Sequence, residues 1–155
     1  MRLYLVQHAE AKREEEDPAR SLSQNGREDI GRIATYVDYH ADIRVEQIVH
    51  SGKTRARQTA EILSDHLKPT KGVNQVDNLE PGADAEIWGK KIEGSSEDLM
   101  MVGHLPHLSN LAAYLIRGVE GTTPIEFRMG CITCLSRKGD GAWSVNWMLI
   151  PEIVE

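Results

Sequence analysis

Short apolar segments alternate with longer amphipathic segments along most of this 155-residue chain, and this alternation constrains the fold more than any other feature. The apolar segments suit buried strands, whereas the amphipathic segments repeat apolar residues at intervals of three and four, as helices do. The predicted strands are 2–7, 46–50, 73–76 and 98–103, and the predicted helices are 24–39, 53–67, 84–93 and 106–117. Strands joined through helices run parallel, in a sheet covered by helices on both faces. We therefore expect an α/β protein with three layers, α/β/α, and a mainly parallel sheet.

The C-terminal part of the chain follows a different pattern. Residues 127–136 and 142–149 alternate between apolar and polar side chains, and the glycine-containing segment 138–141 between them suits a tight turn. This predicts a C-terminal antiparallel hairpin at the edge of the sheet. No internal repeat, linker or low-complexity stretch divides the sequence, so residues 1–155 are predicted to form a single domain.

The charge balance limits the partners that this chain can attract. It has 18 lysine and arginine residues against 24 aspartate and glutamate residues, a net charge of −6 with neutral histidines. Such a chain has no general field for nucleic acid or an anionic membrane, so we expect neither as a partner. The apolar stretch at 3–6 is too short for a signal peptide, and no run approaches the roughly 20 apolar residues of a membrane span. The sequence therefore predicts a cytoplasmic protein that holds any anionic ligand through a local cluster of positive charge.

Polar residues follow the predicted strands at the edge where an open α/β sheet binds its ligands. The first strand ends at Gln7 and His8, the fourth leads to His104, and the second leads to a basic helix start that contains Arg55. A helix start and a guanidinium both suit phosphate oxygens, and a neutral imidazole can attack phosphorus. This rim therefore predicts phosphoryl chemistry.

Five segments of the sequence resemble signatures of the histidine phosphatase superfamily, also called phosphoglycerate mutase-like. The segment around His8, LVQHAEA, resembles the RHG signature, residues 20–26 resemble RPLTxxG, and residues 51–59 resemble SPxxRAxQT. Residues 102–106 resemble VGHxP, and residues 143–147 resemble the last strand. These segments cover nearly the whole chain in the family order, and they are most similar to the small SixA-type phosphohistidine phosphatases.

The resemblance implies roles for individual residues. His8 matches the nucleophile that is transiently phosphorylated, and His104 matches the histidine that stabilises the transferring phosphoryl group. Arg55 matches an arginine of the phosphate pocket, and Arg20 matches a basic residue near its mouth. Because cationic side chains take the place of a metal in such a pocket, we expect neither a metal nor another cofactor. The implied partner is a phosphorylated protein of the histidine phosphotransfer type or a small phosphorylated molecule.

Gln7 departs from the family pattern, which has an arginine immediately before the nucleophile. Its amide can still donate hydrogen bonds to phosphate, but it carries no charge. A charge-assisted hydrogen bond contributes roughly 1.5–3 kcal/mol, so the substitution is expected to weaken phosphate binding or turnover. The alternative to an enzyme is therefore a module that binds a phosphorylated ligand with little or no turnover.

A general acid is the least defined part of the predicted site. Larger members of the superfamily use a glutamate from the loop after the third strand, and Glu80 occupies that region here. Glu80 is a candidate acid, with a solvated loop carboxylate as the alternative. A phosphohistidine substrate needs an acid less, because its imidazole leaves more readily than an alkoxide.

Several other polar residues are expected to have structural roles. Ser23 and Ser51 are predicted to cap the helices that follow them. His107 is predicted to lie on the surface, with a place in the pocket lining as the alternative. Cys131 and Cys134 lie three apart on a predicted strand, where their side chains point to opposite faces. They are therefore interpreted as two buried small residues and not as a metal or redox pair.

Overall fold

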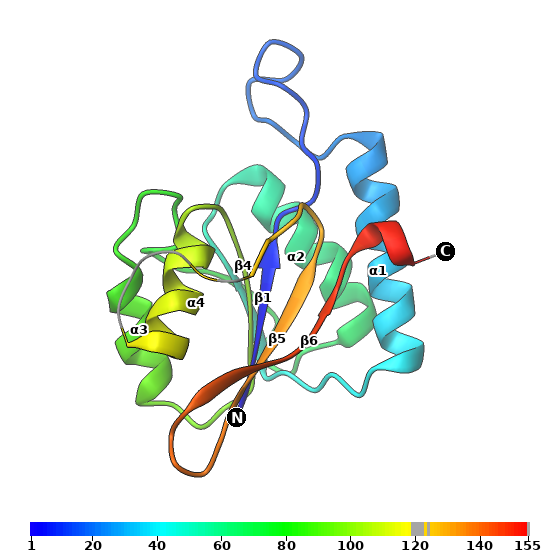
Figure 1. Cartoon of the computed structure of the whole chain (residues 1–155). Helices are drawn as coiled ribbons and strands as arrows, with labels where there is room; N and C mark the ends of the chain where they lie inside the picture. Colours follow the sequence, from blue (N-terminus) through cyan, green and yellow to red (C-terminus); the bar gives the residue numbers. More distant parts are fainter. Residues whose placement is uncertain (119–122, 124, 155) are drawn as a thin grey trace.

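The computed structural model describes residues 1–118, 123 and 125–154, and within them six strands form one sheet (Figure 1). Their order is β3-β2-β4-β1-β5-β6. The strands are β1 (Arg2–Gln7), β2 (Gln47–His50), β3 (Val73–Gln75), β4 (Leu99–Gly103), β5 (Ile132–Arg137) and β6 (Trp143–Leu149). The first four strands pair in parallel, whereas β5 and β6 pair antiparallel at one edge. The predicted mainly parallel sheet with a C-terminal hairpin is confirmed.

Helices cover both faces of this sheet, as the alternating pattern predicted (Figure 1). They are α1 (Gln24–His40), α2 (Thr54–Leu67), α3 (Ala85–Glu93), α4 (His107–Arg117) and the short 3-10 helix η1 (Pro151–Ile153). Tyr4 and Val6 of β1 pack in one core cluster with α1 and α2, whereas Leu3 and Leu5 pack in the other with α3 and α4. Because β1 has a helical layer on each side, its side chains are apolar at both alternating positions.

Helix α1 is held against the chain segment that follows β1. The hydroxyl of Ser23 caps the helix by accepting a hydrogen bond from the backbone N–H of Gly26 (3.0 Å), as predicted. A Cβ at position 26 would lie 2.1 Å from the backbone oxygen of Glu10, so only glycine fits there. This close approach places the start of α1 beside the end of β1.

Most predicted elements begin and end within one residue of the observed ones, but three predictions at element ends were wrong. Strand β5 begins at Ile132, because residues 127–131 include a turn in which Gly130 has a φ of +77°. Pro106 is the N-cap of α4 and not its first helical residue. Ser51 does not cap α2, whose N-cap is Lys53 without a side-chain hydrogen bond. The hydroxyl of Ser51 has a different partner, described below.

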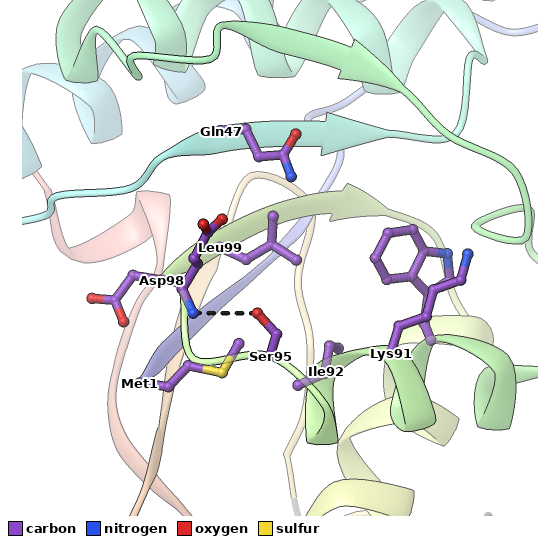
Figure 2. Close-up of a pocket in the computed structure, with 9 residues that line it drawn as sticks. Met1, Gln47, Lys91, Ile92, Ser95, Asp98 and Leu99 are labelled. Atoms are coloured by element: carbon purple, nitrogen blue, oxygen red, sulfur yellow. Dashed lines mark hydrogen bonds between the residues drawn. The ribbon is translucent and has the colours of Figure 1, made fainter.

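A hollow of about 200 Å³ opens at the amino ends of the strands (Figure 2). It lies among Met1, Gln47 at the start of β2, Leu99 at the start of β4, and the end of α3. The histidines predicted at the strand ends lie at the opposite edge, so this hollow is separate from the predicted chemistry. No helix in the described part of the chain is long and apolar enough to cross a membrane.

Candidate active site

The carboxyl ends of β1 and β4 place two histidine side chains together. The strands are parallel neighbours with Gln7 opposite Gly103, so the next residues along each strand, His8 and His104, emerge side by side. The backbone N–H of His8 donates to the oxygen of Gly103 (3.1 Å), and the two imidazole centroids are 5.1 Å apart. The first turn of α2 adds Arg55 to this pair. The structure thus brings together the three residues that the sequence predicted for one rim.

The hydrogen bonds of His8 define its tautomer. Its Nδ1 lies 2.8 Å from the backbone oxygen of Ala9, which can only accept, so Nδ1 carries the proton. The Nε of Arg55 donates to Nε2 of His8 (3.2 Å), which requires a lone pair on that atom. His8 is therefore a neutral imidazole whose unprotonated Nε2 is directed at a guanidinium.

Burial keeps both histidines uncharged. It lowers the pKa of His8 to about 4, against the hydrogen bond to Ala9 and with the help of the positive charges of Arg55 and Arg20. It lowers the pKa of His104 to about 3, and His8 and Arg55 lower it further. At neutral pH the pair is therefore available as a nucleophile and a hydrogen-bonding group, without positive charge.

Ser51 belongs to this site and was missed as a site residue by the sequence reasoning. Its Oγ lies 2.6 Å from Nε2 of His104, whereas the buried Nδ1 of His104 has no hydrogen-bond partner. The contact arises because β2 is the sheet neighbour of β4, with His50 opposite Val102. Ser51 directly follows a predicted strand, which marks it as a possible site residue. Its contact with His104 could not be predicted, because that required knowing that β2 lies next to β4.

Thr59 connects the nucleophile segment to the arginine. Its Oγ1 accepts a hydrogen bond from the backbone N–H of Ala9 (3.0 Å) and donates to the backbone oxygen of Arg55 (2.8 Å). Thr59 is the last residue of the segment 51–59 that resembles SPxxRAxQT, and no separate role was predicted for it. In the structure this fully buried hydroxyl fixes α2 relative to the residue that orients His8.

Arg20 and Gln7 have different environments near His8. Arg20 has a left-handed backbone (φ 49°), and its Nε donates to the oxygen of Lys12 (3.2 Å). Its charge lowers the pKa of both His8 and Arg55, which places it within electrostatic reach of the site. Gln7 instead lines a hollow of about 580 Å³ that also involves residues of α1 and η1, and its buried Oε1 has no hydrogen-bond partner.

Glu80 and His107 differ from each other in exposure. Glu80 is exposed, and its negative charge raises the pKa of His107 against the larger lowering effect of burial. The prediction that His107 lies on the surface is wrong, because the residue is fully buried with no hydrogen-bond partner at either ring nitrogen. Its place in the first turn of α4, against the core, explains the difference.

The two cysteines have the predicted structural environment. Cys131 packs in the cluster under α3 and α4, and Cys134 packs in the cluster under α1 and α2, so the side chains lie on opposite faces of the sheet. Within residues 1–118, 123 and 125–154, no group of three or more histidine, cysteine or acidic side chains is arranged to hold a metal ion.

Comparison with known proteins shows which sequences this chain is similar to. A family model of the histidine phosphatase superfamily (branch 1) matches residues 3–81. Phosphohistidine phosphatase SixA of Escherichia coli (strain K12) is 23% identical over 156 residues, which cover 97% of this chain and 94% of that protein.

Solved structures show the same fold. The protein histidine phosphatase SixA complexed with tungstate superposes with a TM-score of 0.83 at 24% identity, over 97% of both chains. A mutant phosphoserine phosphatase of Entamoeba histolytica in complex with phosphoserine superposes with a TM-score of 0.67 at 13% identity, over 95% of both chains. The fold is therefore shared by proteins named for different phosphorylated substrates, and it leaves the substrate to be argued from the site.

Proposed function

Because this chain belongs to the histidine phosphatase superfamily (branch 1), we propose that it is a phosphohistidine phosphatase that works through a phosphohistidine intermediate on His8. One observation carries the proposal. Nε2 of His8 is unprotonated and lies 3.2 Å from the Nε–H of Arg55, so the nucleophile faces a group that binds phosphate oxygens. A phosphoryl group that enters between them would contact the attacking nitrogen of His8 and the positive charge of Arg55 at the same time.

The first chemical step forms a bond between Nε2 of His8 and phosphorus while the bond from phosphorus to the leaving nitrogen breaks. The electron pair of the broken bond goes to that nitrogen, and the leaving ring departs as a neutral imidazole because its other nitrogen carries a proton. Arg55 donates to the non-bridging oxygens, and His104 donates from Nε2 after exchanging its contact with Ser51 for one with the phosphoryl group. In the second step water attacks phosphorus, and the electrons of the breaking P–N bond return to Nε2. Inorganic phosphate leaves, and the proton lost by the water passes to solvent.

Positive charge at the site comes from side chains. Arg55 and Arg20 both act electrostatically on His8, while Gln7 can contribute an amide hydrogen bond without charge. Stabilisation of a phosphoryl group in flight is mainly a matter of position and charge, which these groups supply. We therefore expect turnover without an added metal ion or cofactor.

The leaving group narrows the substrate class. Glu80 is exposed, and its charge acts on His107. This placement does not favour Glu80 as the acid that would protonate a leaving alkoxide. An imidazole leaving group titrates near neutrality and needs such an acid less. A phosphohistidine, on a phosphorylated protein or in a small molecule, is therefore the favoured substrate over an alkyl phosphate.

A second function is motivated by Gln7. Without the arginine that the family carries at this position, the site could bind a phosphorylated ligand and release it unchanged. This module would hold phosphate through Arg55 and His104 but would show no covalent intermediate on His8.

The test is phosphate release from phosphoimidazole and from an aryl phosphate, with and without a chelator. His8→Ala removes the nucleophile and is expected to lower kcat by at least about 1,000-fold, since catalysis through a covalent intermediate depends on it. The matched control is His40→Ala, at the exposed end of α1. Release that survives in His8→Ala would refute the intermediate. If the wild-type protein binds the phosphorylated compounds but releases no inorganic phosphate from them, it is the binding module. Loss of activity with the chelator would reject metal independence.

A further inference from the structure

Two exposed apolar side chains, Leu105 and Met129, stand on either side of the candidate active site. Leu105 follows His104 at the end of β4 and is 39% exposed, and Met129 precedes Gly130 ahead of β5 and is 48% exposed. In the sheet order β1 lies between β4 and β5, so His8 at the end of β1 lies between the loops that carry these two residues (Figure 1). We refer to Leu105 and Met129 as the rim pair.

The backbone fixes the rim pair close to the nucleophile. The N–H of Gly130 donates to the backbone oxygens of Gln7 (3.0 Å) and His8 (3.3 Å), which ties the Met129 loop to the end of β1. On the other side, the oxygen of His104 accepts from the N–H of Leu108 (2.9 Å), so Leu105, which lies between these two residues, is held just before α4. Both side chains are therefore presented to solvent by segments that also build the site.

The spacing of the rim pair suits a helix that carries the phosphorylated residue. Neighbouring strands are about 4.8 Å apart, so β4 and β5 lie about 10 Å apart across β1. On a helix, side chains four positions before and after a given residue share its face and are separated by about 12 Å along the axis. A phosphohistidine on such a helix could enter the pocket while apolar residues on each side of it cover Leu105 and Met129.

The charges around the rim pair complete the description of the partner. Lys53 at the start of α2 and Arg128 beside Met129 are both exposed, on a chain whose net charge is −6. Arg128 pairs with Glu152 (3.5 Å), but both side chains are exposed, and such a surface ion pair is weak enough to open for an acidic partner. This local positive charge next to apolar side chains suits a protein surface that is apolar around its phosphohistidine and acidic further out. A small phosphate ester could use the positive charge, but it has no need of apolar contacts on both sides of the phosphoryl group.

We propose that the rim pair is the docking surface for a protein substrate, a helix that bears a phosphohistidine flanked by apolar side chains. This inference rests on the proposed function and adds the residues that select a protein over a small phosphorylated molecule. Burial of a partly exposed leucine or methionine at a protein interface is expected to change kcat/KM by about 5-fold for each residue.

The experiment compares three phosphorylated probes: a helical histidine phosphotransfer domain, a short unstructured phosphohistidine peptide, and phosphoimidazole. The wild-type protein is expected to prefer the domain over the other two by about 10-fold or more in kcat/KM. Leu105→Ser and Met129→Ser should each remove about 5-fold of this preference while leaving phosphoimidazole hydrolysis unchanged. The matched control is Val145→Ser, which removes a 44% exposed apolar side chain near the opposite end of the sheet.

The outcomes separate this inference from the proposed function. Equal rates on the domain and the peptide, or serine variants that keep the full preference, would overturn the docking surface while leaving the phosphatase intact. Loss of phosphoimidazole hydrolysis in the serine variants would show that they damage the site and would also count against it. If the wild-type protein hydrolyses none of the probes, the phosphatase proposal fails, and the docking surface is then tested by binding alone. In that case the same variants should raise the Kd for the phosphorylated domain by about 5-fold.

Discussion

The two ends of the sheet differ in how well their polar groups are satisfied. At the amino end, Nζ of Lys91 lies 4.6 Å from the centre of the Trp88 ring, and Asp98 accepts a hydrogen bond from the backbone N–H of Arg2 (2.6 Å). At the carboxyl end, the buried Nδ1 of His104 and Oε1 of Gln7 have no hydrogen-bond partner. The polar groups named at the amino end have partners within the protein, whereas the two buried atoms named at the carboxyl end have none.

This difference indicates function better than the presence of a hollow does, because both ends have one. A buried polar atom without a partner costs about 1–3 kcal/mol, and in native folds such atoms often belong to catalytic groups. The lowered pKa values of His8 and His104 lie at the same end. The carboxyl end is therefore where we expect substitutions to change activity, and the amino end is where we expect them to change stability alone.

After loss of the nucleophile itself, the largest expected effect comes from removing the charge beside it. Arg55→Gln takes away the guanidinium that contacts His8 and should lower kcat/KM by about 100-fold, as the loss of a charge-stabilising donor does. Arg57→Gln is the control on the same helix, where the arginine pairs with Glu61 (2.8 Å) at the surface. Similar activity losses for both variants would mean that the general charge of the helix matters and the specific contact does not.

Acid should weaken the fold through the histidines of the carboxyl end. The pKa of His8 is lowered to about 4 and that of His104 to about 3, whereas an unfolded histidine has a pKa near 6.5. Between these values the unfolded chain binds protons that the folded chain does not, so the free energy of unfolding falls as pH falls below 6.5. Each histidine contributes at most about 1.4 kcal/mol per pH unit.

Urea unfolding at pH 7 and pH 5 measures this dependence. A His104→Asn variant lacks one of the titrating groups and should show a smaller loss of stability between the two pH values. A wild-type protein that is equally stable at both would contradict the assignment of neutral, buried histidines.

A moderate gain is expected from restoring charge before the nucleophile. Gln7→Arg should raise kcat/KM or tighten phosphate binding by about 10-fold, because a charge-assisted hydrogen bond replaces a neutral one. The same change at the other end, Gln47→Arg, is the matched control, since Gln47 lines the hollow at the amino end (Figure 2). Unchanged kinetics in Gln7→Arg would show that the missing charge does not limit the reaction.

The smallest effect is expected at the amino end itself. Lys91→Gln removes the contact between the ammonium group and the Trp88 ring, which is worth about 0.5–1 kcal/mol at an exposed position. Thermal unfolding should shift slightly to lower temperature, and kcat/KM should stay the same. A clear loss of activity in this variant would break the distinction between the two ends.

Secondary structure could be predicted from the sequence, whereas the roles of some polar side chains could not. The spacing of apolar residues predicted the positions of β1 and α1 to within one residue, and the residue type at position 23 predicted its capping role. The same kind of local reasoning assigned Ser51 to a helix cap and His107 to the surface, and both assignments were wrong. Each error concerns a polar side chain whose partner or covering comes from a distant part of the chain.

The amino-acid sequence by itself determined the secondary structure, the layered architecture and the residues that stand at the strand ends. These follow from the spacing of apolar residues, which is a property of neighbouring positions. The tertiary structure alone decided that β1 lies between β4 and β5, that Ser51 contacts His104, and that Nε2 of His8 is the unprotonated nitrogen. Strand order and hydrogen-bond partners depend on contacts between residues far apart in the chain, so the local pattern carries no record of them.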